Sequence, residues 1–302
     1  HSLLSPRPLI YIATAEDQEN LDQLKDKLSQ INVAAHFIDG HQAKEMLPVL
    51  APAYQKRALY ETGIADIDVN ALHEGYLRAV KAAESRIITQ AEVTGLTRQQ
   101  NEWRVTTSQG EFIAPIVINA AGAWVDQVAH MAGISPITIQ PLRRTVIIVT
   151  LPDKGISPSP AVSEWPLVMD VVKGYYFKPD SGKILMTPGD QRLSLPGDAQ
   201  PEESDIAYGA HYLETATTLK VDKIHHSWAG LRNHVADNHP VVGFDPECSG
   251  FFWLAGQGGF GIKTAPAMSR ICASLIAGQG IPEDISRLGL TEQQISIRRI
   301  KP

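Results

Sequence analysis

The feature that most constrains the fold of this chain lies near its C-terminus, over residues 251–278. The apolar run Phe251–Ala255 predicts a strand, and residues 262–278 carry an apolar helical pattern. Between them, Gly256, Gly258 and Gly261 satisfy the spacing G-x-G-x-x-G. A glycine turn between a strand and a helix gathers free backbone N–H groups at the positive end of the helix dipole. Because glycine also lets a ligand approach the backbone, the segment predicts a binding site.

The residues beyond this turn differ from those of a dinucleotide fingerprint. That fingerprint belongs to a βαβ unit, with an acidic residue about 20 residues further on, at the next strand. The chain after Gly278 is polar with little strand signal, and Asp284 follows Pro282 in a loop-like context. The residues alone therefore leave three interpretations: a dinucleotide turn, a turn that only packs a helix on a sheet, and a turn that meets another edge of a ligand.

A second turn of small residues follows another predicted strand. Residues 112–118 are predicted to form one strand, and the continuous apolar run 116–118 predicts burial on both of its faces. The small residues Ala120, Ala121 and Gly122 come almost directly after it. Both turns let a ligand approach the backbone closely. Their presence in one chain favours the interpretation that they bind one extended ligand with several polar edges.

Size and composition set the outer limits. A chain of 302 residues can bury a large core, as one domain or as two interleaved ones. The net charge of −6 argues against nucleic acid as the main partner, because phosphate binding needs a basic face. Cys248 and Cys272 form no disulfide framework or metal-ligand pattern, and we expect Cys272 in the core. No apolar run reaches the roughly 18 residues of a membrane span, so we expect a cytoplasmic protein, with peripheral membrane association left open.

The order of the predicted elements indicates the fold class. The two strand–turn–helix segments flank a middle rich in strands, with turn and loop residues between them. This arrangement predicts an α/β fold of mixed, α+β character, in which an α/β layer is interleaved with an antiparallel sheet.

Three segments together carry a family resemblance. Residues 117–124, 228–232 and 257–262 resemble, in order and spacing, segments of the D-amino-acid oxidase-like FAD-dependent oxidoreductases. Further segments resemble bacterial D-arginine dehydrogenases in particular: residues 1–8, 65–68 with 71–73, 140–141 with 143–145, 176–180 and the C-terminal tail. The resemblance covers essentially the whole chain and implies FAD as the cofactor.

The resemblance also implies a domain division. Residues 64–127 and 234–302 would be the remaining part of a Rossmann-like FAD-binding domain, and residues 4–63 and 128–233 an antiparallel-sheet substrate domain. The unit that holds the FAD pyrophosphate in this family would lie upstream of His1. We therefore expect the 302 residues to be a fragment that binds FAD poorly and is inactive by itself, with the C-terminal turn facing the pyrimidine edge of the flavin.

The implied reaction is the oxidation of a D-amino acid to an imino acid by hydride transfer to the flavin, followed by hydrolysis to a keto acid and ammonia. By resemblance, Tyr176, Arg144 and Arg232 are the catalytic residues, which bind the substrate carboxylate. Gly230 would accept a hydrogen bond from the substrate amine, and Leu9 would line the substrate side chain. The implied cofactor residues are Ala120, Ala121, Gly122, Trp124, Gly230, Gln257, Gly258, Gly259, Phe260, Gly261, Ile262 and Lys263.

The chain departs from the D-arginine dehydrogenase pattern at two positions. Leu9 stands where the pattern has an acidic residue, which favours substrates with uncharged or hydrophobic side chains because an unpaired buried cation is costly. Lys263 stands where the pattern has glutamine, and its charge either stabilises reduced flavin or is simply solvated. We expect neither a catalytic base at His234 nor a metal site at His225 and His226.

Other interpretations stay open at this point. Arg143 and Arg144 are compatible with surface charges, and Tyr176 with a core position. A sarcosine- or glycine-oxidase-like amine oxidase is one alternative function. A non-catalytic accessory chain without its own FAD pyrophosphate site is another. The expected partners are a small D-amino acid and an electron acceptor of unknown identity, with no nucleic acid and no transmembrane segment.

Overall fold

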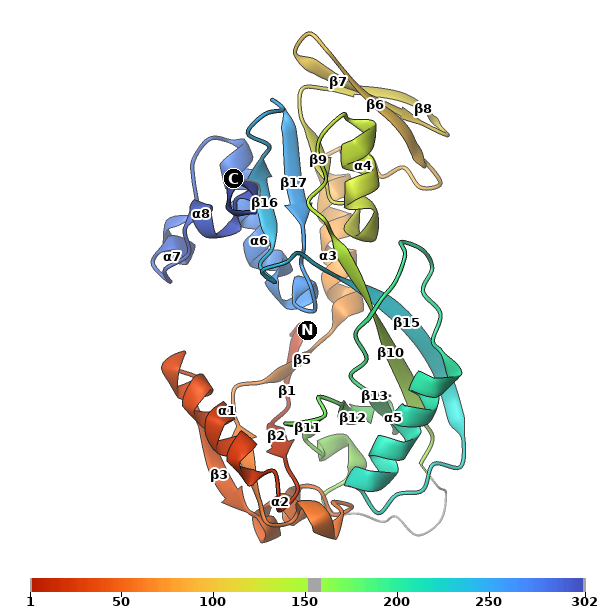
Figure 1. Cartoon of the computed structure of the whole chain (residues 1–302), viewed down its shortest axis with the longest axis vertical. Helices are drawn as coiled ribbons and strands as arrows, with labels where there is room; N and C mark the ends of the chain where they lie inside the picture. The colour runs from red at the N-terminus through yellow and green to blue at the C-terminus, as the bar shows by residue number, and fades with distance from the viewer. Residues whose placement is uncertain (1, 152–158, 301–302) are drawn as a thin grey trace. The chain divides into compact units, whose positions relative to one another are not determined.

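The computed structural model describes residues 2–151 and 159–300, which form two compact units. The first unit comprises residues 1–72, 143–192 and 198–230, and the second comprises residues 73–142, 193–197 and 231–302 (Figure 1). The boundaries of these units differ from those of the two domains that the resemblance implies. The prediction that one domain binds FAD and the other binds substrate stays a prediction. None of the helices in the described ranges is long and apolar enough to cross a membrane.

The first unit is built on a nine-stranded sheet in the order β14-β10-β13-β12-β11-β2-β4-β3, with β15 also paired to β10. β2 and β11 are parallel, whereas the pairs β10–β13, β13–β12, β12–β11, β2–β4 and β4–β3 are antiparallel. The strands are β2 (Leu9–Ile12), β3 (Ala35–Asp39), β4 (Arg57–Glu61), β10 (Gln140–Val149), β11 (Leu167–Asp170), β12 (Tyr176–Asp180), β13 (Lys183–Thr187), β14 (Arg192–Leu193) and β15 (Ile224–His234).

One face of this sheet carries the core of the unit. Cross-strand partners Ile10, Val168, Phe177, Met186 and Ile147 follow one another across five strands and belong to a single buried cluster. The helices of the unit are α1 (Gln18–Gln30), α2 (Gly40–Met46) and α5 (Glu203–Ala216), with 3₁₀ turns η1 (Pro52–Tyr54) and η3 (Val162–Glu164). A short ladder joins β1 (Leu4–Pro6) to β5 (Ala65–Ile67), and α5 packs against β13 (Figure 1).

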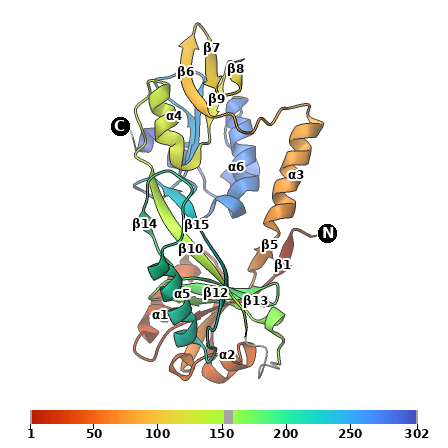
Figure 2. The ribbon, with the colours of Figure 1, turned by 90° about the vertical axis from the view of Figure 1, so that its right-hand side faces the viewer.

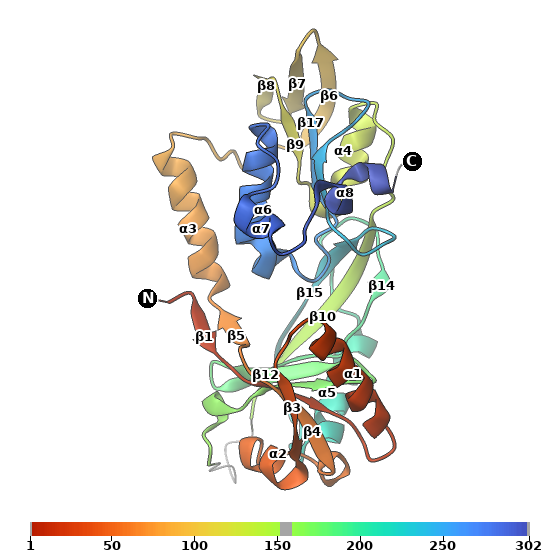
Figure 3. The same ribbon diagram turned by 90° about the vertical axis from the view of Figure 1, so that its left-hand side faces the viewer.

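The second unit contains a small sheet whose central strand is buried on both faces. Its order is β16 (Val241–Phe244), β17 (Phe251–Ala255) and β9 (Val117–Asn119), with β17 parallel to β9 and antiparallel to β16. Because successive side chains of a strand point to opposite faces, Phe251 and Trp253 join one buried cluster, and Phe252 joins another. Helix α4 (Val125–Met131) contributes to the first cluster and α6 (Gly261–Ile276) to the second (Figure 3).

The rest of the second unit surrounds this sheet. An antiparallel meander of β6 (Val93–Gln99), β7 (Glu102–Thr107) and β8 (Gly110–Ala114) contacts α4 through β6 (Figure 2). Helix α3 (Val69–Ala82) leads into the unit, and the 3₁₀ turn η2 (Gly122–Trp124) precedes α4. The chain after α6 forms α7 (Glu283–Ser286), α8 (Glu292–Ile295) and η4 (Ile297–Arg299).

The mixed α/β fold and the C-terminal strand–turn–helix are confirmed, and Cys272 is buried as expected. The prediction of one strand over residues 112–118 is wrong. Pro115, which has no N–H to donate to a ladder, lies between β8 and β9. Burial of the run 116–118 on both faces is also wrong, since 47% of Ile118 is exposed.

A matched pair of leucines tests the core of the second unit. Leu96 is 4% exposed in the cluster that contains Trp103 and Phe251, whereas Leu288 is 85% exposed. We expect Leu96→Ala to lower the free energy of unfolding by about 2–5 kcal/mol, because it leaves a cavity. Leu288→Ala should change it by less than about 0.5 kcal/mol. Denaturant unfolding measures both values, and equal values would contradict the packing described.

An ion-pair cluster in the first unit predicts pH-dependent stability. The Asp66 carboxylate contacts Arg7 Nε at 2.5 Å and Lys178 Nζ at 2.6 Å. Burial alone would raise the pKa of Asp66, but the hydrogen bonds from Lys178 and Arg7 outweigh it and hold the pKa below 3.8. The stabilisation is therefore complete well above pH 3.8 and is lost as the pH falls through the lower pKa of the folded state.

Asp66→Asn should lower the free energy of unfolding at neutral pH by roughly 1–3 kcal/mol, since charge-assisted hydrogen bonds are lost. The difference from wild type should shrink when unfolding is measured at increasingly acidic pH. A difference that stays constant down to strongly acidic pH would show that Asp66 does not act through its charge.

Candidate functional site

The glycine turn between β17 and α6 is held against the end of β15. Gly256 and Gly258 have φ of +68° and +54°, a conformation that disfavours side chains. A Cβ placed on Gly258 would lie 2.8 Å from His234 Cε1, and one on Gly259 would lie 3.0 Å from Arg232 Nη1. The Gly258 N–H donates to the Asn233 carbonyl at 2.9 Å. The glycines therefore let a neighbouring strand pack directly on the turn.

The second turn of small residues reaches the same strand end. Asn119 ends β9 and is 2% exposed; its side-chain amide donates to the Val125 carbonyl at 2.9 Å and fixes the turn. Gly122 has φ of +58°, and a Cβ there would lie 3.5 Å from Asn233 Nδ2. The structure thus brings the two predicted cofactor segments together, and Asn233 touches both of them. Sequence reasoning missed Asn233, for which the only available signal was its place directly after Arg232.

Several of the predicted cofactor residues are exposed around these turns. Trp124 is 43% exposed, Phe260 53% and Ile262 52%. The Lys263 ammonium lies 4.8 Å from the centre of the Phe260 ring, a cation–π distance. Large exposed apolar side chains beside a helix N-terminus and two glycine turns provide a cradle for a flat, partly apolar ligand.

The predicted substrate residues of the first unit share one face of the nine-stranded sheet. Leu9 is 4% exposed, and Tyr176 is half-buried on the face opposite the neighbouring core residue Phe177. Arg144 lies an odd number of positions from the core residue Ile147 on β10, so it also points away from the core.

Gly230 and Arg232 are two residues apart on β15 and lie on one face of that strand. Arg232 belongs to the second unit, and its guanidinium lies beside Gly259 of the glycine turn.

The surface-charge interpretation of the paired arginines is wrong for both. Arg144 is 7% exposed. Arg143 contacts Glu202 at 2.5 Å and the buried Asp205 at 3.0 Å. The hydrogen bond that Arg143 donates to Glu202 raises the pKa of Arg143. Arg143 therefore takes part in a structural ion pair.

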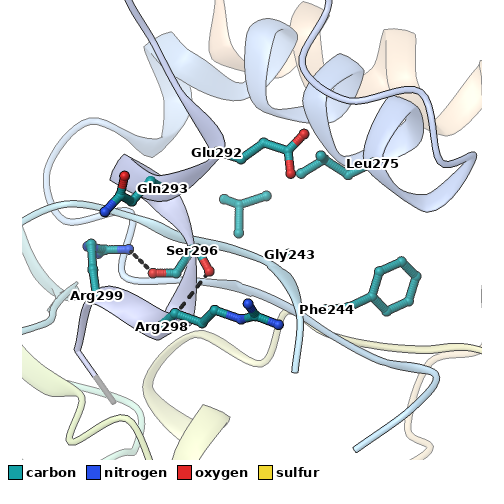
Figure 4. Close-up of a pocket in the computed structure, with 9 residues that line it drawn as sticks. Gly243, Phe244, Leu275, Glu292, Gln293, Ser296, Arg298 and Arg299 are labelled. Atoms are coloured by element: carbon teal, nitrogen blue, oxygen red, sulfur yellow. Dashed lines mark hydrogen bonds between the residues drawn. The ribbon is translucent and has the colours of Figure 1, made fainter. Parts of the chain in front are cut away.

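A cavity of about 620 Å³ lies elsewhere in the second unit and contains none of the predicted site residues. Figure 4 shows Glu292 and Arg298 among the side chains that line it. One wall is fixed by Arg299, which binds Asp237 at 2.6 Å and thereby lowers the pKa of that carboxyl group. The lining residues are Val242, Gly243, Phe244, Leu275, Glu292, Gln293, Ser296, Arg298 and Arg299.

The chain has curated relatives along nearly its full length. Glycine oxidase of Geobacillus kaustophilus is 25% identical over 299 residues, which cover 95% of this chain and 74% of the relative. The hydrogen cyanide synthase subunit HcnC of Pseudomonas aeruginosa is 22% identical over 277 residues, or 90% of this chain and 63% of that protein. The chain thus spans about two thirds to three quarters of these relatives.

Solved structures share the fold. L-proline dehydrogenase from P. horikoshii aligns with this chain with a TM-score of 0.80 and 21% identity. The alignment covers 99% of this chain and 77% of the dehydrogenase chain. Residues 1–275 match the family model DAO, described as FAD dependent oxidoreductase. The chain therefore belongs to the DAO family of FAD-dependent oxidoreductases, which confirms FAD as its cofactor.

Proposed function

We propose that the protein oxidises the carbon–nitrogen bond of a small amino acid, with D-amino acids as its first candidate substrates. The product is an imino acid, which water converts to a keto acid and ammonia. Bound FAD would supply the acceptor for the hydride. The exposed side chains of Trp124, Phe260 and Ile262 beside the two glycine turns support such a cofactor.

The guanidinium of Arg232 carries this proposal. It packs against the backbone of Gly259, and no carboxylate of the described residues forms an ion pair with it. A forked cation at a ligand-binding turn suits a carboxylate, which it binds through two parallel hydrogen bonds. In this assignment Arg232 holds the substrate carboxylate beside the cofactor cradle.

The remaining roles are carried over from the family resemblance, and their residues belong to the first unit. Arg144 and the Tyr176 hydroxyl donate further hydrogen bonds to the carboxylate, and the Gly230 carbonyl accepts one from the substrate amine. Leu9 lines the side chain of the substrate. Its cross-strand neighbour Glu61 is 6% exposed and already accepts a hydrogen bond from the Tyr11 hydroxyl at 2.7 Å. Glu61 is thus a buried acceptor beside Leu9, and the proposed preference for uncharged side chains rests on Leu9 alone.

The second candidate is an oxidase of glycine or N-methylated amino acids. It is supported by the 25% identity to a glycine oxidase over 95% of this chain. Oxidation of sarcosine with a higher kcat/KM than that of any D-amino acid would favour this candidate. An accessory, non-catalytic role is compatible with the subunit name of HcnC, and the absence of flavin from the purified protein would favour it.

We also propose that a further polypeptide segment completes the FAD site. β9 is one of the two edge strands of its three-stranded sheet, and Ile118 on it is 47% exposed. An open parallel edge with an exposed isoleucine favours pairing with another strand. The greater length of the matched relatives is consistent with such a segment.

The assignment of Arg232 predicts a defect in substrate binding. Arg232→Met should raise KM for a D-amino acid roughly 10- to 100-fold, because charge-assisted hydrogen bonds to the carboxylate are lost. Steady-state reduction of a dye by the FAD-loaded protein measures this effect. Arg86→Met removes an exposed arginine of the same unit and serves as the matched control. Unchanged KM in Arg232→Met would contradict the assignment.

A further inference from the structure

Two opposite charges line the cavity of about 620 Å³ in the second unit. Glu292 lies on α8 and Arg298 on η4, and both side chains are exposed. Within the described ranges, neither the Glu292 carboxylate nor the Arg298 guanidinium forms an ion pair or a hydrogen bond, and Figure 4 shows no bond between them. The cavity therefore offers one anionic and one cationic group to a ligand.

The segment that carries both charges is held in place by its own packing. Ile295 and Ile297 are 2% and 1% exposed and anchor the segment in the core. Arg299 donates from Nε to Asp237 Oδ2 at 2.6 Å and from Nη2 to Asp237 Oδ1 at 3.2 Å. The two charges lie on separate short turns of this segment, so the wall that presents them is formed before any ligand arrives.

The same cavity has an apolar part. Val242 and Phe244 are two residues apart on β16, so their side chains lie on one face of that strand. Phe244 is 38% exposed and meets Phe252 edge to face, with 5.0 Å between the ring centres. Leu275 of α6 packs against the cluster that contains Val242. An apolar surface with a few polar groups is typical of small-molecule sites.

The charges restrict the ligand. A carboxylate suits Arg298, whose guanidinium can donate two parallel hydrogen bonds, but Glu292 repels a ligand that is only anionic. A ligand that is only cationic suits Glu292 and is repelled by Arg298. A zwitterion satisfies both groups, and its apolar part can cover Val242 and Phe244. The cavity volume of about 620 Å³ is in the usual range for small ligands.

We infer that this cavity binds a free amino acid with an apolar side chain, with its carboxylate on Arg298 and its ammonium group on Glu292. The cavity contains none of the residues predicted for FAD or for the substrate, so it would be a second amino-acid site. Binding there involves no chemical step. The inference goes beyond the proposed function and does not depend on it.

The test measures the binding of L-leucine and two analogues to the purified protein by isothermal titration calorimetry. 4-Methylpentanoate lacks the amine of leucine, and 3-methylbutylamine lacks its carboxylate. Wild type should bind each analogue about tenfold or more weakly than L-leucine, because one charge-assisted contact is lost. Equal affinity for all three compounds would overturn the inference, as would the absence of L-leucine binding.

Two variants of exposed side chains assign the contacts. Glu292→Met should bind L-leucine and 4-methylpentanoate with similar affinity, since the partner of the amine is missing. Arg298→Met should bind L-leucine and 3-methylbutylamine with similar affinity. The matched controls Glu74→Met and Arg86→Met remove exposed charges elsewhere in the same unit and should discriminate as wild type does. Wild-type discrimination in Glu292→Met or in Arg298→Met would show the inference to be wrong.

A further variant separates this cavity from the proposed substrate site. Arg232→Met should bind L-leucine as wild type does. If Arg232→Met loses L-leucine and Arg298→Met retains it, L-leucine binds at the substrate site and the inference fails while the proposed function stands. Conversely, failure of every amino acid to reduce bound FAD would refute the proposed function without affecting the binding measured here.

Discussion

The hydrogen bond from the Gly258 N–H to the Asn233 carbonyl joins the parts on which the candidate site depends. It holds the end of β15 against the turn before α6, at a separation that only glycine allows at Gly258 and Gly259. Arg232 and Asn233 owe their positions to this contact. It is one of the contacts that keep the Arg232 guanidinium beside the turn that precedes α6.

The sheets explain how the remaining residues reach their positions. In the small sheet, β17 and β9 run parallel, so the turns after them emerge at one edge. In the nine-stranded sheet, alternation of side chains buries Phe177 and Ile147 while Tyr176 and Arg144 point to the other face. In each unit, one region packs into the core, and another carries polar groups suited to ligand binding.

The sequence predicted the fold class, the C-terminal strand–turn–helix and the approximate places of the small-residue turns, because these depend on local pattern. It did not predict the break at Pro115 or the exposure of Ile118, since strand continuity and edge position depend on neighbours far along the chain. Asn233 was missed for the same reason: its significance arises from tertiary contact with Gly122 and Gly258. The ion pair of Arg143 with Asp205 likewise joins residues that no local pattern connects.

We propose that this member of the DAO family oxidises amino acids beside the two glycine turns. The most direct measurement is anaerobic addition of single enantiomers to the FAD-loaded protein while the absorbance of oxidised flavin is recorded. We expect bleaching by a D-amino acid with a small uncharged side chain and none by its L-enantiomer. Flavin that stays bound and oxidised with every amino acid and secondary amine tested would contradict it.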